Sequence, residues 1–282
     1  MPRDSGVPRA RNAEKAEVDM GTGVEVSMVT ARRRDFIDYL ASDRLGNAFA
    51  LYDLQEEADR VRCWAASKEN SFVGYLLLWY GMISPHAILR GSREAAYSLL
   101  PEAPKDGCTF LVDPVCSSCV EDTREVAARL MMDLMVATEE SARLVRDQGV
   151  RRLTAEDGTS MALLYDEPGR GGDRDFGAWI ERGIAFGVYD GGRLVSVGGT
   201  HLKSEDLCFI GGVYTASDYR RRGYAARVTS AVTKKALEQV PTVSLLVVSA
   251  NRAAIRLYRK LGYRKVSEWV WMDVGTGRNP LM

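Results

Sequence analysis

A basic turn that contains glycine stands between a strand-like segment and a helical segment in the C-terminal half of the chain. The turn reads Arg220-Arg221-Arg222-Gly223-Tyr224-Ala225; the apolar segment 207–215 precedes it and the helical pattern 226–239 follows it. The first backbone N–H groups of a helix have no partner within the helix and lie at the positive end of its dipole. A strand, a glycine turn and a helix in this order therefore predict an anion site, above all for phosphate.

Glycine is the residue that such a turn requires, because Gly223 has no Cβ and lets the backbone approach a pyrophosphate closely. The expected donors are the N–H groups of residues 221–226. The three arginine side chains would raise the local positive potential, or would simply form a solvated basic turn.

A second segment, 251–263, reads Asn-Arg-Ala-Ala-Ile-Arg-Leu-Tyr-Arg-Lys-Leu-Gly-Tyr and predicts a helix that ends at Gly262. Asn251 and Tyr258 are seven residues apart and so lie on nearly the same helix face. Tyr258 belongs to the apolar stripe of that helix. It is either a core residue or a proton donor, and Asn251 is either a helix cap or a ligand contact.

Together the two motifs resemble the GNAT superfamily of acyl-CoA-dependent N-acyltransferases. The phosphate turn of that family has the form Q/R-x-x-G-x-G/A, matched here by Arg220, Gly223 and Ala225. Its second signature is matched by Asn251, Leu257, Tyr258, Lys260, Gly262 and Tyr263. The resemblance is close over about residues 150–274 and is one of pattern alone in the first half.

The resemblance implies an α/β (α+β) GNAT fold, in which helices flank a mixed, mostly antiparallel sheet. It implies transfer of an acetyl group from acetyl-CoA to a primary amine of a small molecule or peptide, by direct attack in a ternary complex. Tyr258 would be the acid that protonates the departing thiolate. The implied cofactor-binding residues are Val213, Tyr214, Thr215, Arg220, Arg221, Arg222, Gly223, Tyr224, Ala225, Ala226 and Asn251.

The strand before the turn is expected to part from the strand at 243–250, leaving room for the thioester. The pair Gly211-Gly212 indicates a bulge or a close ligand contact there. Backbone N–H groups of residues 213–215 would contact the pantetheine arm or polarise the thioester carbonyl.

The general base is not evident, because the middle of this strand carries no carboxylate where many relatives have a glutamate. Asp206 and Glu205 precede the strand, and His201 ends the strand before it. A water chain could replace a single base. Cys208 is a poor nucleophile, since an apolar strand raises the pKa of a thiol.

The two halves of the chain share a pattern of strand, polar turn, strand, short link and strand, at 63–91 and at 185–215. This predicts two copies of one unit, with chance similarity as the alternative. The expected divisions are a disordered tail at 1–22, a degenerate GNAT-like domain at 23–148 and a catalytic domain at 149–282. Only the second copy has the basic turn, so one cofactor site is expected. Helical spacing of apolar residues also predicts a helix over 121–140.

Composition narrows the remaining classes of function. The chain has 282 residues, with 38 basic and 38 acidic side chains, so a general nucleic-acid binder is disfavoured. No apolar run is long enough for a membrane span and no signal peptide is evident, which favours the cytoplasm. Cys116 and Cys119 form a C-x-x-C, but with two histidines in the chain no metal site is expected, and the five cysteines are interpreted as reduced thiols.

We expect a monomer or homodimer that takes acetyl-CoA as co-substrate. Three alternatives stay open at this level: a non-catalytic acyl-CoA sensor, an aminoacyl transferase of tandem build, and a mycothiol-synthase-like tandem enzyme. The neutral net charge argues against the aminoacyl transferase, because that enzyme would have to bind tRNA.

Overall fold

A single twelve-stranded sheet runs through the whole molecule in the order β1-β2-β3-β4-β5-β12-β6-β11-β10-β9-β8-β7. The computed structural model describes residues 23–30, 32–81, 84–165 and 175–276, and the expected tail at 1–22 lies outside them. The strands are β1 (Glu25–Val29), β2 (Val61–Lys68), β3 (Ser71–Trp79), β4 (His86–Gly91), β5 (Cys108–Val112), β6 (Ala128–Thr138), β7 (Val150–Arg152), β8 (Ala185–Asp190), β9 (Arg193–Lys203), β10 (Leu207–Thr215), β11 (Thr242–Val248) and β12 (Arg264–Val274).

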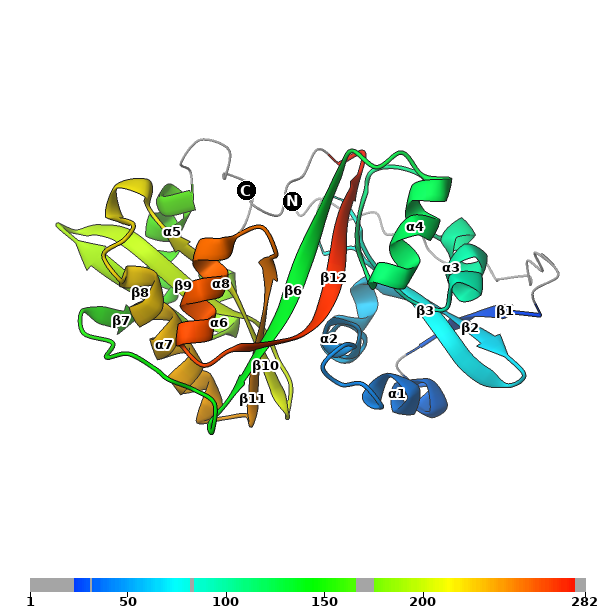
Figure 1. Ribbon diagram of the computed structural model, residues 1–282, viewed down its shortest axis with the longest axis horizontal. Coiled ribbons are helices and arrows are strands. Elements are labelled where there is room, and N and C mark those ends of the chain that lie inside the picture. The colour runs from blue at the N-terminus through cyan, green and yellow to red at the C-terminus, as the bar shows by residue number, and fades with distance from the viewer. Residues whose placement is uncertain (1–22, 31, 82–83, 166–174, 277–282) are drawn as a thin grey trace, which may run out of the picture.

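Helices cover both faces of this sheet in two lobes (Figure 1). They are α1 (Arg34–Ala41), α2 (Ala48–Glu56), α3 (Arg93–Leu99), α4 (Pro114–Thr123), α5 (Gly158–Tyr165), α6 (Phe176–Arg182), α7 (Tyr224–Leu237) and α8 (Arg252–Lys260). Among the described strands, β4–β5 and β10–β11 run parallel and the other neighbours are antiparallel. The expected mixed, mostly antiparallel α/β architecture is thus confirmed.

The two lobes exchange strands at the centre of the sheet. β6 comes from the first half of the sequence and pairs with β11 from Thr242↔Thr138 to Val248↔Met132, while β12, the last strand, pairs with β5. β6 and β12 also pair with each other, and in Figure 1 they cross the middle of the molecule in green and red. A boundary at 148/149 therefore separates β6 from the strand that it supports.

The helix expected over 121–140 is wrong: α4 ends at Thr123 and β6 occupies 128–138. β6 carries apolar residues toward both faces of the sheet, with Met135 in the cluster under α7 and α8 and Leu134 in the cluster under α1 and α2. A strand that is buried on both faces has a nearly continuous apolar run. Such a run cannot be told from a buried helix by periodicity alone.

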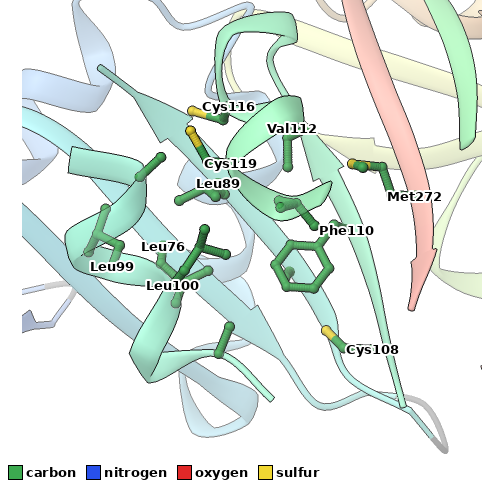
Figure 2. Close-up of a cluster of buried hydrophobic side chains, with 14 of the residues drawn as sticks. Leu76, Leu89, Leu99, Leu100, Cys108, Phe110, Val112, Cys116, Cys119 and Met272 are labelled. Carbon is green, nitrogen blue, oxygen red and sulfur yellow. The ribbon is translucent and has the colours of Figure 1, made fainter. Parts of the chain in front are cut away.

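A separate core lies between α3, α4 and the sheet, and it contains three of the cysteines (Figure 2). Cys108 of β5 and Cys116 and Cys119 of α4 lie there among Leu89, Phe110 and other buried side chains, including Met272 of β12. Burial raises the pKa of the Cys108 thiol to about 12 and that of Cys116 well above its usual range. Thiols in such surroundings stay protonated and unreactive, which supports the interpretation of ordinary reduced cysteines.

The strand exchange predicts that the C-terminal half cannot fold without β6. A fragment of residues 149–282 is expected to be unfolded, because β11 and its apolar residues lose their neighbour. A fragment of residues 124–282 keeps β6 between β11 and β12, and we expect it to unfold cooperatively in urea. Circular dichroism of the two fragments tests this, and cooperative unfolding of the shorter one would contradict it.

Candidate active site

The basic turn forms an open set of backbone donors at the start of α7. Gly223 is the N-cap of this helix with a left-handed φ of +79°, and Arg221 has a φ of +64°. The first bond from the helix back to the turn runs from the Arg227 N–H to the Gly223 carbonyl, at 3.1 Å. In the described part of the chain no acceptor is recorded for the N–H groups of residues 221–226. This is the arrangement that favours an anion.

Two of the three arginine side chains are engaged within the turn itself. Arg220 Nε donates to the Thr215 carbonyl at 3.0 Å, and Arg222 donates to the Asp218 carbonyl at 3.1 Å. The Arg222 guanidinium also lies 4.9 Å from the centre of the Tyr219 ring. These contacts hold the loop in shape, so the main-chain N–H groups are the groups best placed to bind an anion.

The two central strands part just before this turn. The β10–β11 ladder runs from Leu207↔Thr242 to Ile210↔Leu245 and ends there. Beyond that point β10 remains paired with β9 as far as Thr215, and β11 remains paired with β6 as far as Val248. Each strand is therefore held on its outer side while the inner edges are unpaired with each other, as expected from the sequence.

A bulge marks the point of parting. Between Gly211↔Gly199 and Tyr214↔Val197 the strand β10 has an extra residue, and Gly212 has a φ of +60°. The Tyr165 hydroxyl of α5 donates to the Gly212 carbonyl. The expected bulge at the double glycine is confirmed, and it displaces residues 213–215 from the regular path of the strand.

The bulge leaves the backbone of residues 213–215 at the open edge of β10. Tyr214 is buried with its ring stacked on Tyr165, at 5.3 Å between ring centres, and its carbonyl accepts a hydrogen bond from the Ser196 hydroxyl at 3.1 Å. The Thr215 hydroxyl lies 2.8 Å from that of Ser196. The side chains thus anchor this edge, and contact with the cofactor stays a prediction for its backbone.

Tyr258 belongs to the buried cluster that contains Ile210 and Leu245, the last paired residues of the two strands. Burial raises the pKa of Tyr258 to about 12, so its hydroxyl is protonated at neutral pH. Among the described residues its hydroxyl has no recorded hydrogen-bond partner. The neighbouring Tyr263, with ring centres 5.9 Å apart, does have one, the Thr233 hydroxyl at 2.7 Å. Tyr258 therefore has a proton to donate that the fold itself does not use.

Asn251 caps α8, with its side-chain oxygen accepting the Ala254 N–H at 3.1 Å. Capping is one of the two roles expected for it, and contact with a cofactor stays a prediction. α8 ends at Lys260 and is followed by Gly262 with a φ of +94°, which confirms the expected glycine stop.

Asp206 and Glu205 lie away from the point of parting. They precede Leu207, where β10 and β11 are still paired, and Gly211 is four residues further on, about 13 Å at roughly 3.3 Å per residue. Asp206 forms an ion pair with Arg44 of the first half. The structure does not bring these carboxylates together with Tyr258 or the turn, and their role as base stays a prediction that this placement does not favour.

His201 and two aromatic residues do meet at the bulge. A Cβ added to Gly211 would lie 1.8 Å from Cδ2 and 2.0 Å from Nε2 of His201, so the imidazole sits directly on this glycine. Trp179 of α6 contacts the imidazole, with ring centres 6.1 Å apart. Sequence reasoning missed Trp179 and Tyr165. The sequence did contain one hint, the glycines at 199, 211 and 212. Glycines close together on neighbouring strands leave space for large aromatic rings.

The corresponding place in the first half is closed. β4 and β5 are paired as far as Leu89↔Val112. Just beyond, the Gly91 N–H donates to the Asp113 carboxylate at 3.3 Å, and the Cys116 thiol donates to the Gly91 carbonyl at 3.4 Å. These bonds hold together the strand ends that are apart in the second half, which supports one cofactor site in the chain.

α2 of the first half packs across the face of the sheet that carries His201. Phe49 and Asp53 of this helix are spaced at i and i+4 and so share one face, and Glu57 follows the helix as its C-cap. The Phe49 ring lies 4.5 Å from that of Phe209 on β10, and Glu57 lies 3.7 Å from Arg182 of α6. Asp53 lies on this helix between Phe49 and Glu57 in sequence. Its burial, together with the nearby charge of Glu57, raises its pKa to about 7.

Several known proteins are similar to this chain. Residues 185–272 match the family model "FR47-like protein". A solved structure of a Drosophila protein is similar with a TM-score of 0.70 at 17% identity, covering 90% of this chain and 99% of that one. A putative acetyltransferase from the GNAT family of Novosphingobium aromaticivorans has a TM-score of 0.55 at 23% identity, covering 72% and 89%. A search of curated proteins gave no match.

A protein with two GNAT units in tandem is also among the similar solved structures. A tandem GNAT protein from the clavulanic acid biosynthesis pathway has a TM-score of 0.58 at 13% identity, covering 91% of this chain and 99% of that one. The chain therefore has the GNAT fold, which confirms the resemblance found in the sequence at the level of the fold. Its second half contains the FR47-like region.

Among the described residues no helix combines the length and apolar character that a membrane crossing requires. In the same part of the chain, no group of three or more histidine, cysteine, aspartate or glutamate side chains is placed to hold a metal ion.

The raised pKa of Asp53 predicts a pH-dependent stability. An acid whose pKa is higher in the folded state than its ordinary value near 4 destabilises the fold as pH rises from about 4 to about 7, by at most about 4 kcal/mol. Asp53→Asn should therefore raise the free energy of unfolding at pH 8 and change it much less at pH 4. Asp59→Asn, which removes an exposed carboxylate nearby, should show no such difference. Urea titrations at both pH values test this, and equal behaviour of the two variants would contradict it.

Proposed function

We propose that this protein transfers an acetyl group from acetyl-CoA to a primary amine of a small molecule or peptide, by direct attack in a ternary complex. One observation carries the proposal. The donors at the start of α7 follow directly on the strand edge that has parted from β11, and Tyr258 lies in the cluster at that parting. Acetyl-CoA needs an anion site for its pyrophosphate, an open channel for its pantetheine arm and a proton donor for its sulfur, and these features follow one another along the site.

Each part of the site has a role in this reaction. The N–H groups of residues 221–226 bind the pyrophosphate, assisted by the charge of the arginines. The pantetheine arm takes the place of a strand beside residues 213–215, where the backbone polarises the thioester carbonyl. Tyr258 gives its proton to the coenzyme A sulfur as the C–S bond breaks. Asn251 contacts the cofactor in addition to capping α8.

The division of labour between the halves follows from the same geometry. The second half, completed by β6, is the catalytic unit, and the closed first half walls one side of the acceptor site. We infer no metal and no nucleic-acid or membrane partner for the reaction. A cytoplasmic monomer or homodimer is sufficient for it, since the described site is built from one chain.

Gly223→Val is expected to lower the affinity for acetyl-CoA at least about 30-fold. A β-branched residue at positive φ is strained, and its side chain would occupy the place of the anion. A Cβ here meets no protein atom within 4 Å, so the variant should fold. Gly149→Val is the matched control, with a φ of +77° and equally open surroundings. Calorimetric titration measures both, and unchanged affinity for the Gly223 variant would refute the anion site.

Tyr258→Phe is expected to lower kcat by about 100-fold without changing the affinity for acetyl-CoA, because it removes the proton donor alone. Tyr263→Phe is the control, and it should change stability but not turnover. Loss of its bond to Thr233 should reduce stability by about 1 kcal/mol and leave kcat unchanged. Turnover of a panel of amines and thermal unfolding give the two readouts. If Tyr258→Phe retained full turnover, Tyr258 would be a core residue, and binding without turnover by the unaltered protein would make the chain an acyl-CoA sensor.

A further inference from the structure

His201 occupies a special position in the sheet, as the extra residue of a bulge in β9. Leu202 pairs with Phe209 and Thr200 pairs with Ile210, so the register shifts by one residue at His201. Its imidazole is thereby turned onto Gly211, the first residue of β10 beyond the last β10–β11 pair. A side chain at Gly211 would displace the ring. The imidazole is thus placed beside the opening between the two strands.

The imidazole and Tyr258 lie on opposite faces of the sheet at this opening. Successive residues of a strand point to opposite faces. Ile210 belongs to the cluster under α7 and α8 that contains Tyr258, whereas Phe209 belongs to the cluster under α1 and α2. Gly211, two residues from Phe209, presents the same face as Phe209, and His201 covers it. A thioester held in the opening would have an imidazole on one side and a phenol on the other.

The face that carries His201 is shaped by both halves of the protein. Trp179 lies against the imidazole and also over Gly199, where an added Cβ would be 2.3 Å from the indole. Phe49 of α2 covers Phe209 on the neighbouring part of β10. The charged groups on the elements packed around this face are Asp53 and Glu56 of α2, Glu57 directly after it, Glu181 and Arg182 of α6, and Arg193 and Lys203 of β9. The three atoms nearest to a Cβ built on Gly211 all belong to the exposed imidazole of His201. The imidazole is therefore the titratable group closest to this glycine.

An imidazole is well suited to remove a proton from an amine at neutral pH, since histidine ordinarily titrates near pH 6.5. The other candidates are less well placed. β10 itself carries no carboxylate, and Asp206 is paired with Arg44 at the closed end of the ladder.

We propose that His201 is the general base of the acyl transfer and that the amine acceptor approaches from the face formed by Trp179 and α2. The proposal rests on the function proposed above. Nε2 of His201 takes a proton from the ammonium form of the acceptor, and the neutral amine then attacks the thioester carbon to form a new N–C bond. The C–S bond breaks as the sulfur takes the Tyr258 proton. The new amide nitrogen loses its remaining extra proton through solvent to the Tyr258 phenolate, and His201 releases its proton to solvent. The products are the amide and coenzyme A as a thiol.

The test compares the two histidines of the chain in otherwise identical proteins. His201→Gln and His86→Gln are assayed for acetyl-CoA binding by calorimetry and for kcat/KM between pH 6 and 10 with an amine that the unaltered protein acetylates. We expect His201→Gln to bind acetyl-CoA normally, to lose at least about 100-fold in kcat/KM at pH 7, and to recover most of it near pH 10, where the amine is already deprotonated. His86→Gln should match the unaltered protein throughout.

A second pair of variants separates catalysis from structure. His201→Gly should regain activity when imidazole is added to the buffer, and His86→Gly should show no response to it. An unchanged pH profile in His201→Gln, or no rescue in a folded His201→Gly, overturns the role of His201 while acetylation by the unaltered protein leaves the proposed function standing. If the unaltered protein binds acetyl-CoA and acetylates no amine, both proposals fail together.

Discussion

The site depends on one interruption in backbone pairing, the end of the β10–β11 ladder after Ile210 and Leu245. Unpaired strand edges are unfavourable inside a sheet, because each N–H and C=O group there needs another partner. The molecule tolerates the interruption because β9 holds β10 and β6 holds β11 on their outer sides. The opening is therefore held on both sides by regular strand pairing, and a ligand with amide groups of its own can complete it.

The exchange of β6 and β12 ties this opening to the whole chain. β6 has to come from the first half to support β11, and β12 returns to pair with β5. The two halves therefore share one sheet and cannot be regarded as domains joined by a linker. One consequence is that α2 of the first half is held against β10, where Phe49 contacts Phe209. The first half, whose own strand ends are joined by the bond between Gly91 and Asp113, thus still packs against the face of β10 that carries Phe209.

Chemical groups are separated by the two faces of the sheet. Tyr258 and the start of α7 belong to one face, and His201 with Trp179 belongs to the other. The gap between β10 and β11 beyond Ile210 and Leu245 is where a ligand could contact both faces of the sheet. Burial keeps Tyr258 protonated, and exposure leaves His201 accessible to solvent. In the reaction proposed above, this separation places the base on the side of the acceptor nitrogen and the acid on the side of the departing sulfur.

Local sequence determined the parts that depend on a residue's own backbone. Gly223 and Gly262 adopt positive φ at the start of α7 and the end of α8, Asn251 caps α8, and Gly212 forms the bulge, all as the residue types predict. Only the tertiary structure decided the partners. Arg44 reaches Asp206 across 162 residues, β6 is a strand because it is buried between β11 and β12, and the imidazole of His201 rests on Gly211 because a bulge turns it there. Caps and turns are set by neighbouring atoms along the chain, whereas strand pairing and ring contacts depend on residues that come together only when the sheet forms.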